Sequence, residues 1–256
     1  MNTLSVIKKN DYDILQLNRG RSNPISHEMV KEIRAYLKEK IQDESTRGVI
    51  LHGNTDGYFS VGLDLKELYY FDEKQIASFW EDWDAMVYEL ATFPKPMIAA
   101  INGYSPAGGC VLAITCDYRI MAAGEKFMIG LNELAVGIVM PENLYQLAAF
   151  WMGRRRAYYN LFRGNLLSVE QAHKEGLIDE VVEMEEVLPR AEKEMQKLLR
   201  SPDNLLINSK ANMRRELWDR LDGIEEVDVN LKLKAWFDPA SRGVMKMIVE
   251  QLEKRK

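Results

Sequence analysis

The sequence contains only two cysteines and three histidines among its 256 residues. Cys110 and Cys116 lie in one apolar run and form neither a disulfide framework nor a metal-type pair, which favours a reducing compartment. His27, His52 and His173 are scattered along the chain without the spacing of metal ligands. We therefore expect no metal site.

Long apolar runs are absent as well. No stretch approaches the roughly 20 apolar residues that are needed to span a membrane. The first 17 residues have neither the apolar core of a secretory signal nor the Arg-rich, acid-poor composition of a transit peptide. Hydrophobic residues make up 46% of the sequence and charged residues 29%, which is typical of a soluble globular protein. We expect a cytoplasmic protein with no membrane partner.

Positive charge does not predominate: the sequence has 34 lysines and arginines against 39 aspartates and glutamates, so the formal net charge is −5. Nucleic-acid-binding proteins normally carry a basic surface, so we expect no nucleic-acid partner. An anionic ligand remains compatible with this balance, since a few local lysines and arginines can hold phosphates. The run Arg154-Arg155-Arg156 is interpreted most simply as a solvated face or a helix start.

The N-terminal segment predicts a hairpin followed by a helix. Val6–Ile7 and Ile14–Leu17 flank the polar turn Asn10-Asp11, as the two strands of a hairpin do. Ser26 is a suitable N-cap for a helix, because the apolar residues that follow it recur at helical spacing. These apolar residues are Val30, Ile33, Leu37 and Ile41.

Strands and helices alternate over the next hundred residues. Short buried strands are predicted over 48–52, 97–101 and 118–122, with helices around 79–90 and over 110–115. Such alternation implies parallel strands joined by crossover connections. From about Ala148 the pattern is helical, with breaks near 176–182 and at Pro202 and Pro239. We predict an α/β core over 1–199 and a helical C-terminal region over 200–256.

Two turns rich in small residues are candidates for ligand binding. Tyr58–Lys66 follows a strand, and Asn102–Cys110 runs from a strand into a helix. Glycine lets a ligand approach backbone N–H groups, and a helix N-terminus favours negative charge. Two N–H groups from separate turns could thus stabilise one developing oxyanion. The alternative is that Gly108 and Gly109 only permit tight packing of a helix on a strand.

Glu133 is an acid within the otherwise apolar run Ile129–Gly137. Apolar surroundings raise the pKa of a carboxyl group, which suits a general base or acid. The alternative is a solvated turn residue or an acid that caps a helix. The sequence has no Gly-x-Ser-x-Gly motif, and no pairing of a nucleophile with a base is evident.

Taken together, Phe59–Lys66, Asn102–Asp117 and Ile129–Gly137 resemble the crotonase superfamily, also called the enoyl-CoA hydratase/isomerase family. The resemblance extends from about Val6 to the C-terminus. It implies an α/β protein with the crotonase (ClpP-like) fold, in which repeated ββα units build two nearly perpendicular sheets. It also implies a C-terminal helical trimerisation region, and therefore a homotrimer or a hexamer made of two trimers.

The resemblance also implies roles for individual residues. Glu133 matches the catalytic glutamate, and the N–H groups of Leu63 and Gly108 match the oxyanion-hole donors. Coenzyme A is expected as part of an acyl-CoA substrate, so no separate cofactor is expected. The residues expected to bind the substrate or its coenzyme A part are Arg19, Arg21, Ser60, Asp64, Leu65, Lys66 and Val111.

Departures from the family pattern narrow the expected activity. Hydratases place a second glutamate where this chain has Val111. Dienoyl-CoA isomerases place an aspartate there and another where this chain has Pro141. The remaining single carboxylate fits the Δ3,Δ2-enoyl-CoA isomerases of the mitochondrial type, which convert 3-enoyl-CoA to trans-2-enoyl-CoA in fatty-acid degradation.

Two alternatives stay open. One is another reaction on an acyl-CoA, hydration or thioester hydrolysis, with Glu142 as a second carboxylate. The other is a non-catalytic acyl-CoA-binding protein. Acyl-chain length is expected to depend on pocket walls formed by Tyr69–Trp83 and the C-terminal helices.

Overall fold

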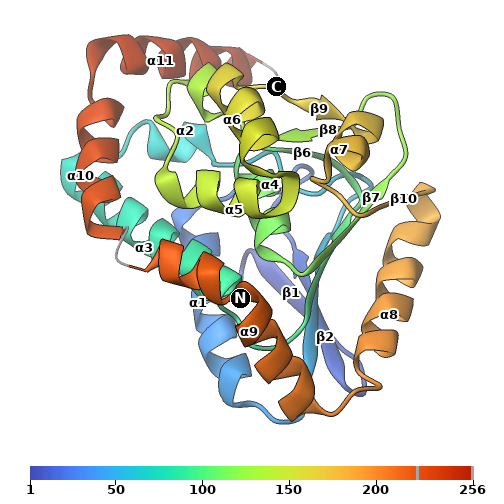
Figure 1. Cartoon of the computed structure of the whole chain (residues 1–256). Helices are drawn as coiled ribbons and strands as arrows, with labels where there is room; N and C mark the ends of the chain where they lie inside the picture. Colours follow the sequence, from blue (N-terminus) through green and yellow to red (C-terminus); the bar gives the residue numbers. More distant parts are fainter. Residues whose placement is uncertain (223–224, 255–256) are drawn as a thin grey trace.

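Two β-sheets with helices packed around them form the molecule (Figure 1). The computed structural model describes residues 1–222 and 225–254, and for 225–228 it describes the backbone alone. The larger sheet has the order β1-β2-β3-β5-β7-β10, and the smaller one has the order β4-β6-β8-β9. The strands of the larger sheet are β1 (Leu4–Lys8), β2 (Tyr12–Leu17), β3 (Gly48–Gly53), β5 (Met97–Ile101), β7 (Tyr118–Ala122) and β10 (Glu180–Val182). Those of the smaller sheet are β4 (Gly57–Tyr58), β6 (Gly103–Pro106), β8 (Met128–Gly130) and β9 (Leu167–Ser168).

The N-terminal prediction is confirmed. Strands β1 and β2 pair antiparallel, with Leu4 opposite Leu17. Ser26 caps α1 (His27–Gln42), where its side chain accepts a hydrogen bond from the Met29 N–H. Ile41 was expected on the apolar face, but it is exposed. Lys40 is buried at this end of the helix instead, because its ammonium group binds the Asp43 carboxylate at 2.8 Å.

Pairs of strands followed by helices repeat along the first half of the chain, as the family resemblance implied. The first unit is β1, β2 and α1, the second adds α2 (Leu65–Leu68) and α3 (Glu73–Ala91) to β3 and β4, and the third ends with α4 (Gly108–Thr115). The second strand of the first unit, β2, lies beside β3, and β3, β5 and β7 follow one another in the sheet; these four strands run parallel. Every residue of α4 is buried. The site therefore grows from turns that lie at the ends of central elements.

The second half of the chain is mainly helical. Strand β9 is a departure from the predicted helical pattern, because two residues are too few to show alternation, whereas β10 falls in the predicted break near 176–182. The first of these helices begins at Glu142, six residues before the predicted start, and Pro202 and Pro239 mark helix starts as expected. The elements are η1 (Glu133–Val136), α5 (Glu142–Met152), α6 (Arg154–Arg163), α7 (Val169–Glu175), η2 (Met184–Glu186), α8 (Val187–Leu198), α9 (Asp203–Leu221), α10 (Glu225–Trp236) and α11 (Pro239–Lys254).

Polar contacts attach the C-terminal helices to the core. The carboxylate of Asp117 binds Lys210 Nζ at 2.7 Å and Arg214 Nη2 at 2.9 Å, which fixes α9. Helix α10 packs on α3, and α11 packs on both α2 and η1 (Figure 1). This arrangement places α11 beside α2, where the first candidate turn ends, and beside η1, which begins with Glu133. Within the described residues, no helix combines the length and apolarity that crossing a membrane requires.

Candidate active site

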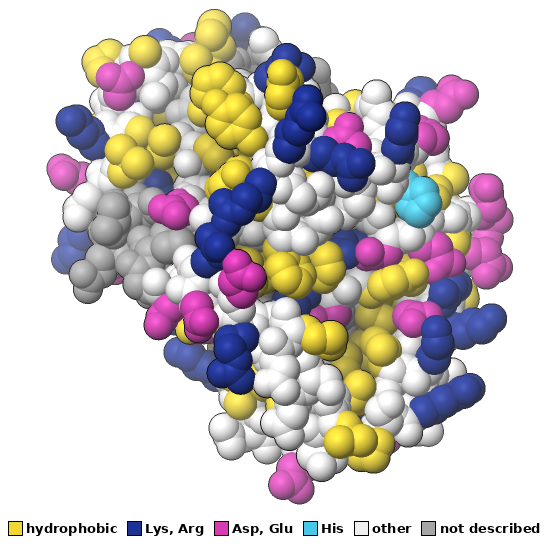
Figure 2. Space-filling view, viewed as in Figure 1, with side chains coloured by type: hydrophobic (Ala, Val, Ile, Leu, Met, Phe, Trp, Pro, Cys, Tyr) yellow, Lys and Arg dark blue, Asp and Glu magenta, His cyan; other side chains and the backbone are white. Residues whose placement is uncertain are grey.

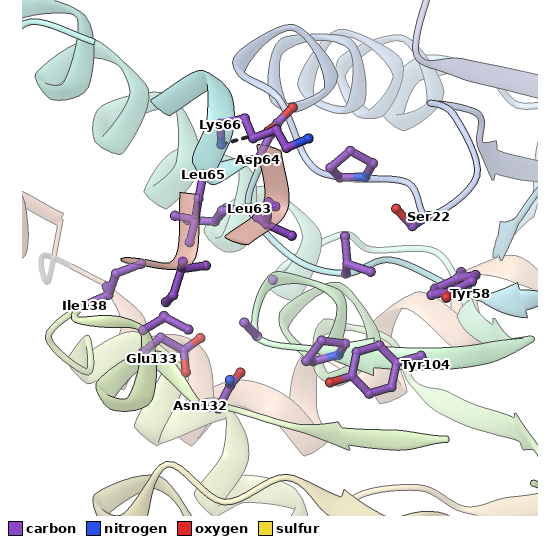
Figure 3. Close-up of a pocket in the computed structure, with 18 of the residues that line it drawn as sticks. Ser22, Tyr58, Leu63, Asp64, Leu65, Lys66, Tyr104, Asn132, Glu133 and Ile138 are labelled. Atoms are coloured by element: carbon purple, nitrogen blue, oxygen red, sulfur yellow. Dashed lines mark hydrogen bonds between the residues drawn. The ribbon is translucent and has the colours of Figure 1, made fainter. Parts of the chain in front are cut away.

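A cavity of about 960 Å³ lies where the turn after β4, the start of α4, η1 and α11 meet (Figure 3). Leu63, Gly108 and Glu133 all line it. They are separated by up to 70 positions in the sequence, and the crossover connections of the sheets bring them together. The fold therefore gathers the three residues expected to perform catalysis around one space, which is large enough for a small-molecule ligand.

The two turns that carry Leu63 and Gly108 touch each other. Gly62 has a φ of +87°, and a Cβ added to it would lie 3.1 Å from the Gly108 nitrogen. Among the described residues, no acceptor is found for the N–H of Leu63 or of Gly108. Unpaired backbone donors are rare in protein interiors, so the two groups are available to a ligand oxygen. Ser60 supports the turn, because its hydroxyl donates to Asn23 O at 2.7 Å and accepts from the Gly62 N–H.

Ala107 holds an unusual backbone conformation immediately before Gly108. Its φ is +45° and its ψ −120°, a combination that L-residues rarely adopt. Such a conformation costs on the order of 1–3 kcal/mol and persists only where its surroundings enforce it. Here the Ala107 N–H donates to Gly130 O at 2.8 Å, which anchors the turn to β8. The strain is thus located where the chain turns the Gly108 N–H away from the strand.

The sequence left open that Gly108 and Gly109 only permit tight packing of a helix on a strand. Gly109 does have this packing role. A Cβ at this position would lie 2.4 Å from the Ser60 carbonyl oxygen, closer than real contacts allow. At Gly108 the nearest atoms are looser, at 3.0–3.2 Å, and they include the Gly62 Cα. Close packing and exposure of an N–H donor are therefore compatible functions of this turn.

Replacing Gly62 by alanine should block the Gly108 donor. We expect turnover to fall by about a hundredfold, as is typical when one oxyanion donor is lost. The matched control is Gly20→Ala, since Gly20 also has a positive φ (+60°) but nothing lies within 4 Å of its added Cβ. Steady-state kinetics of both variants decide the point: equal losses would attribute the effect to backbone strain and not to the donor.

Glu133 begins η1 and is only 6% exposed. Burial raises the pKa of its carboxyl group to about 7, an effect that its own backbone N–H partly opposes. One carboxylate oxygen, Oε2, is buried and has no hydrogen-bond partner among the described residues. Glu133 is therefore not a solvated turn residue. Its carboxyl group faces the cavity (Figure 3) with a pKa suited to accept and return a proton near neutral pH.

Asp56 and Asp64 also line the cavity, but no acid stands at position 111 or 141, where the family resemblance would place a second one. Val111 is buried within α4, and Pro141 contributes an apolar surface to the cavity. Glu142 is exposed at the start of α5, where Gln146 Nε2 donates to it at 3.3 Å, and it is not part of the cavity lining. Neighbouring charges do not contribute to the pKa shift of Glu133.

The residues expected to bind coenzyme A have different positions. Arg21, Leu65 and Lys66 line the cavity, and so does Asp64, whose side chain caps α2 by accepting from the Lys66 N–H at 3.1 Å. Arg19 does not line the cavity, and its Nη1 instead binds Oδ2 of Asp64 at 2.5 Å. Ser60 and Val111 are buried outside the lining.

The cavity lining includes further residues for which no individual role was predicted. Trp80 and Trp83 come from α3, while Ile248 and Leu252 come from α11, in agreement with the two regions expected to form the acyl pocket walls. Asn132 precedes Glu133 and points toward the cavity (Figure 3), and its Oδ1 is buried without a partner among the described residues. Its adjacency to Glu133 was the only signal that could have identified it. Tyr58 and Tyr104 also line the cavity and belong to the two candidate turns, whereas Lys126 and Phe127 were missed.

Comparison with known proteins assigns this arrangement to a family. The family model for enoyl-CoA hydratase/isomerase matches residues 10–256. The chain is 35% identical to the mitochondrial enoyl-CoA delta isomerase 1 of Mus musculus over 95% of its own length and 84% of that protein. It is 40% identical to the Rattus norvegicus protein of the same name over 84% of this chain and 75% of that one. The crystal structure of human mitochondrial Δ3-Δ2-enoyl-CoA isomerase superposes with a TM-score of 0.94 at 30% identity, covering 99% of both chains.

Proposed function

Because the chain belongs to the enoyl-CoA hydratase/isomerase family, we propose that it is a Δ3,Δ2-enoyl-CoA isomerase in which Glu133 alone moves the proton. One observation carries the proposal: the buried Glu133 carboxyl group, with a pKa of about 7, shares a cavity with two backbone N–H donors that have no acceptor among the described residues. A proton shift needs one group that both accepts and donates. Addition of water needs a second group to hold that water, and Val111 and Pro141 are apolar.

The reaction proceeds through an enolate. The thioester carbonyl of a 3-enoyl-CoA accepts hydrogen bonds from the N–H groups of Leu63 and Gly108. The Glu133 carboxylate then removes a proton from C2, and the electrons of the broken C–H bond delocalise onto the carbonyl oxygen. Protonated Glu133 returns the same proton to C4, so the double bond moves from C3=C4 to C2=C3. No atom is gained or lost, and Glu133 ends ionised.

The cavity offers separate places for the two ends of the substrate. Arg21, Lys66 and Lys126 supply positive charge for the phosphates of coenzyme A, which is part of the substrate and not a cofactor. The acyl chain is placed between α3 and α11, where the aromatic and aliphatic wall excludes water. Exclusion of water also maintains the raised pKa of Glu133.

An assay with 3-enoyl-CoA and 2-enoyl-CoA thioesters of several chain lengths tests the proposal. We expect 3-enoyl-CoA to be converted to the conjugated 2-enoyl-CoA, and 2-enoyl-CoA to gain no water. Hydration that is lost in Glu142→Ala would favour the hydratase alternative. Binding of acyl-CoA without exchange of the C2 proton for solvent deuterium would favour a non-catalytic protein.

The pH profile follows from the pKa of Glu133. The free enzyme must hold Glu133 ionised to accept the C2 proton, and burial raises its pKa to about 7. We therefore expect kcat/KM to increase about tenfold per pH unit below pH 7 and to level off above it. Initial rates from pH 5 to 9 with a saturating coupling system measure this. A profile that is flat down to pH 5 would mean that the reacting base is a solvated carboxylate with an ordinary pKa.

Three further properties remain part of this proposal. We expect a homotrimer or a hexamer formed by two trimers, a role in fatty-acid degradation and a cytoplasmic location. The relatives named above are mitochondrial proteins. Measurement of the molecular mass in solution would determine the assembly.

A further inference from the structure

A second cavity, of about 860 Å³, lies between α6, the start of β9 and α7, and shares no residue with the first. Four arginines line it, three of which form the run at the start of α6. Figure 2 shows Lys and Arg side chains gathered on the face that α6 presents in this view. In a protein with a net charge of −5, this concentration of positive charge is local. The four residues are Arg154, Arg155, Arg156 and Arg163.

The arginines of this cavity form no ion pair within 4 Å in the described part of the chain, although Arg154 adds to the effect of Arg220 in lowering the pKa of Glu216. Seven arginines elsewhere form ion pairs within 4 Å, whereas none of these four does. The acid in the lining, Glu175, accepts a hydrogen bond from Asn160 Nδ2 at 2.5 Å. The first turn of α6 also contains no acidic residue, so its cations lie at the positive end of a helix dipole. Positive charges that lie close together without ion-pair partners repel one another, which does not stabilise the folded chain. A bound anion would reduce this repulsion.

One wall of the cavity is formed by a single face of helix α6. Tyr159, Asn160 and Arg163 lie three, four and seven residues after Arg156, which places all four on one face of the helix. The Arg163 guanidinium lies 4.6 Å from the centroid of the Tyr159 ring, and Asn165 Nδ2 donates to Asn160 Oδ1 at 3.3 Å. These contacts hold the wall in place before any ligand binds.

The distance between two of the arginines indicates the size of the ligand. Arg156 and Arg163 are seven residues apart, so their Cα atoms are separated by about 10 Å along the helix axis. A guanidinium group binds phosphate oxygens through paired hydrogen bonds, and one phosphate is too small to meet both ends of this wall. We propose that the cavity is a binding site for a small anion with two or more phosphate groups, of the nucleoside diphosphate class.

Calorimetric titration of the full chain with inorganic diphosphate and with ADP, at constant ionic strength, tests this site. We expect saturable binding of one ligand per chain and at least a tenfold loss of affinity in the double variant Arg156→Gln/Arg163→Gln. The matched control is Arg200→Gln/Arg215→Gln, which removes two exposed arginines outside the cavity and should bind like the unmodified protein.

Coenzyme A also carries a diphosphate, so the KM for acyl-CoA is measured in the same variants. An unchanged KM in Arg156→Gln/Arg163→Gln supports a site separate from the catalytic cavity. The proposal is overturned if the unmodified protein shows no saturable binding, if chloride at equal ionic strength competes as well as diphosphate, if both double variants lose affinity equally, or if the KM rises together with the loss of diphosphate binding.

Discussion

Replacing Glu133 by glutamine should lower isomerase turnover by about a thousandfold or more, because a positioned general base contributes factors of this order. Glutamine has nearly the same volume but cannot accept the C2 proton. The two oxyanion donors belong to the backbone of Leu63 and Gly108, so the variant should bind an acyl-CoA with nearly unchanged affinity. Formation of the conjugated thioester measures turnover, and titration with a saturated acyl-CoA measures binding.

The matched control for this variant is Glu142→Gln. Glu142 is exposed at the start of α5, beside Pro141, which does line the cavity. The same chemical change at this position should leave isomerisation within about twofold of the unmodified enzyme, as expected for a surface substitution. Near-normal turnover in Glu133→Gln would refute Glu133 as the base, and a large loss in Glu142→Gln would restore a second carboxylate to the mechanism.

The buried carboxyl group of Glu133 should also lower the free energy of unfolding at neutral and alkaline pH. The pKa of Glu133 is raised from an ordinary 4.5 to about 7, so the folded state prefers the neutral acid. The folded chain therefore binds more protons than the unfolded chain between pH 4.5 and 7, and stability decreases as the pH rises through this window. The cost at pH 8 is roughly 3 kcal/mol. Glu133→Gln should be more stable than the unmodified protein at pH 8, and the gain should vanish below pH 4.5.

Buried strands and capped helices could be predicted from the sequence because their signals are local. The runs over 48–52, 97–101 and 118–122 are apolar enough to identify central strands, and Ser26 marks the start of α1. The turn at Ala107 could not be predicted, since alanine gives no sign of a positive φ; its conformation comes from the hydrogen bond to Gly130 and from contact with Gly62. Trp80 and Trp83 belong to the stretch that was expected to form a pocket wall, and they lie both in the core and in the cavity lining.

The part of the cavity that the C-terminal helices form could be predicted from the sequence only in general terms. These helices were expected to contribute to the pocket walls, but no residue of theirs was named. Ile248 and Leu252 reach the cavity because α11 packs on α2 and η1, a contact between segments separated by more than a hundred residues. Arg242 helps to fix it: both its terminal nitrogens donate to the Tyr69 carbonyl at 3.0 Å, and its guanidinium lies 3.7 Å from the Tyr69 ring centroid. No local pattern indicates such a partnership.

Helix α10, which connects α9 to α11, is held by a buried ion pair. The Lys232 ammonium binds the Asp84 carboxylate on α3, and both side chains are about 1% exposed. Asn143 Nδ2 donates to the same carboxylate oxygen at 3.4 Å, and the ammonium lies 5.4 Å from the Trp80 ring centroid. Because Trp80 lines the cavity, this pair connects the docking of α10 to the wall against which the acyl chain is expected to lie.

Replacing Lys232 by methionine should destabilise the fold by about 3–5 kcal/mol, since removing one partner leaves the other charge buried and uncompensated. The exposed Lys234 on the same helix is the matched control, and Lys234→Met should change the free energy of unfolding by no more than about 0.5 kcal/mol. Neutralising both partners in Lys232→Met/Asp84→Asn removes the unpaired charge, so the double variant should recover most of the loss. Urea titrations of these four proteins and of the Asp84→Asn single variant measure the coupling free energy. Additive losses in the double variant would show that the two side chains stabilise the fold independently, and that the pair does not hold α10 on α3.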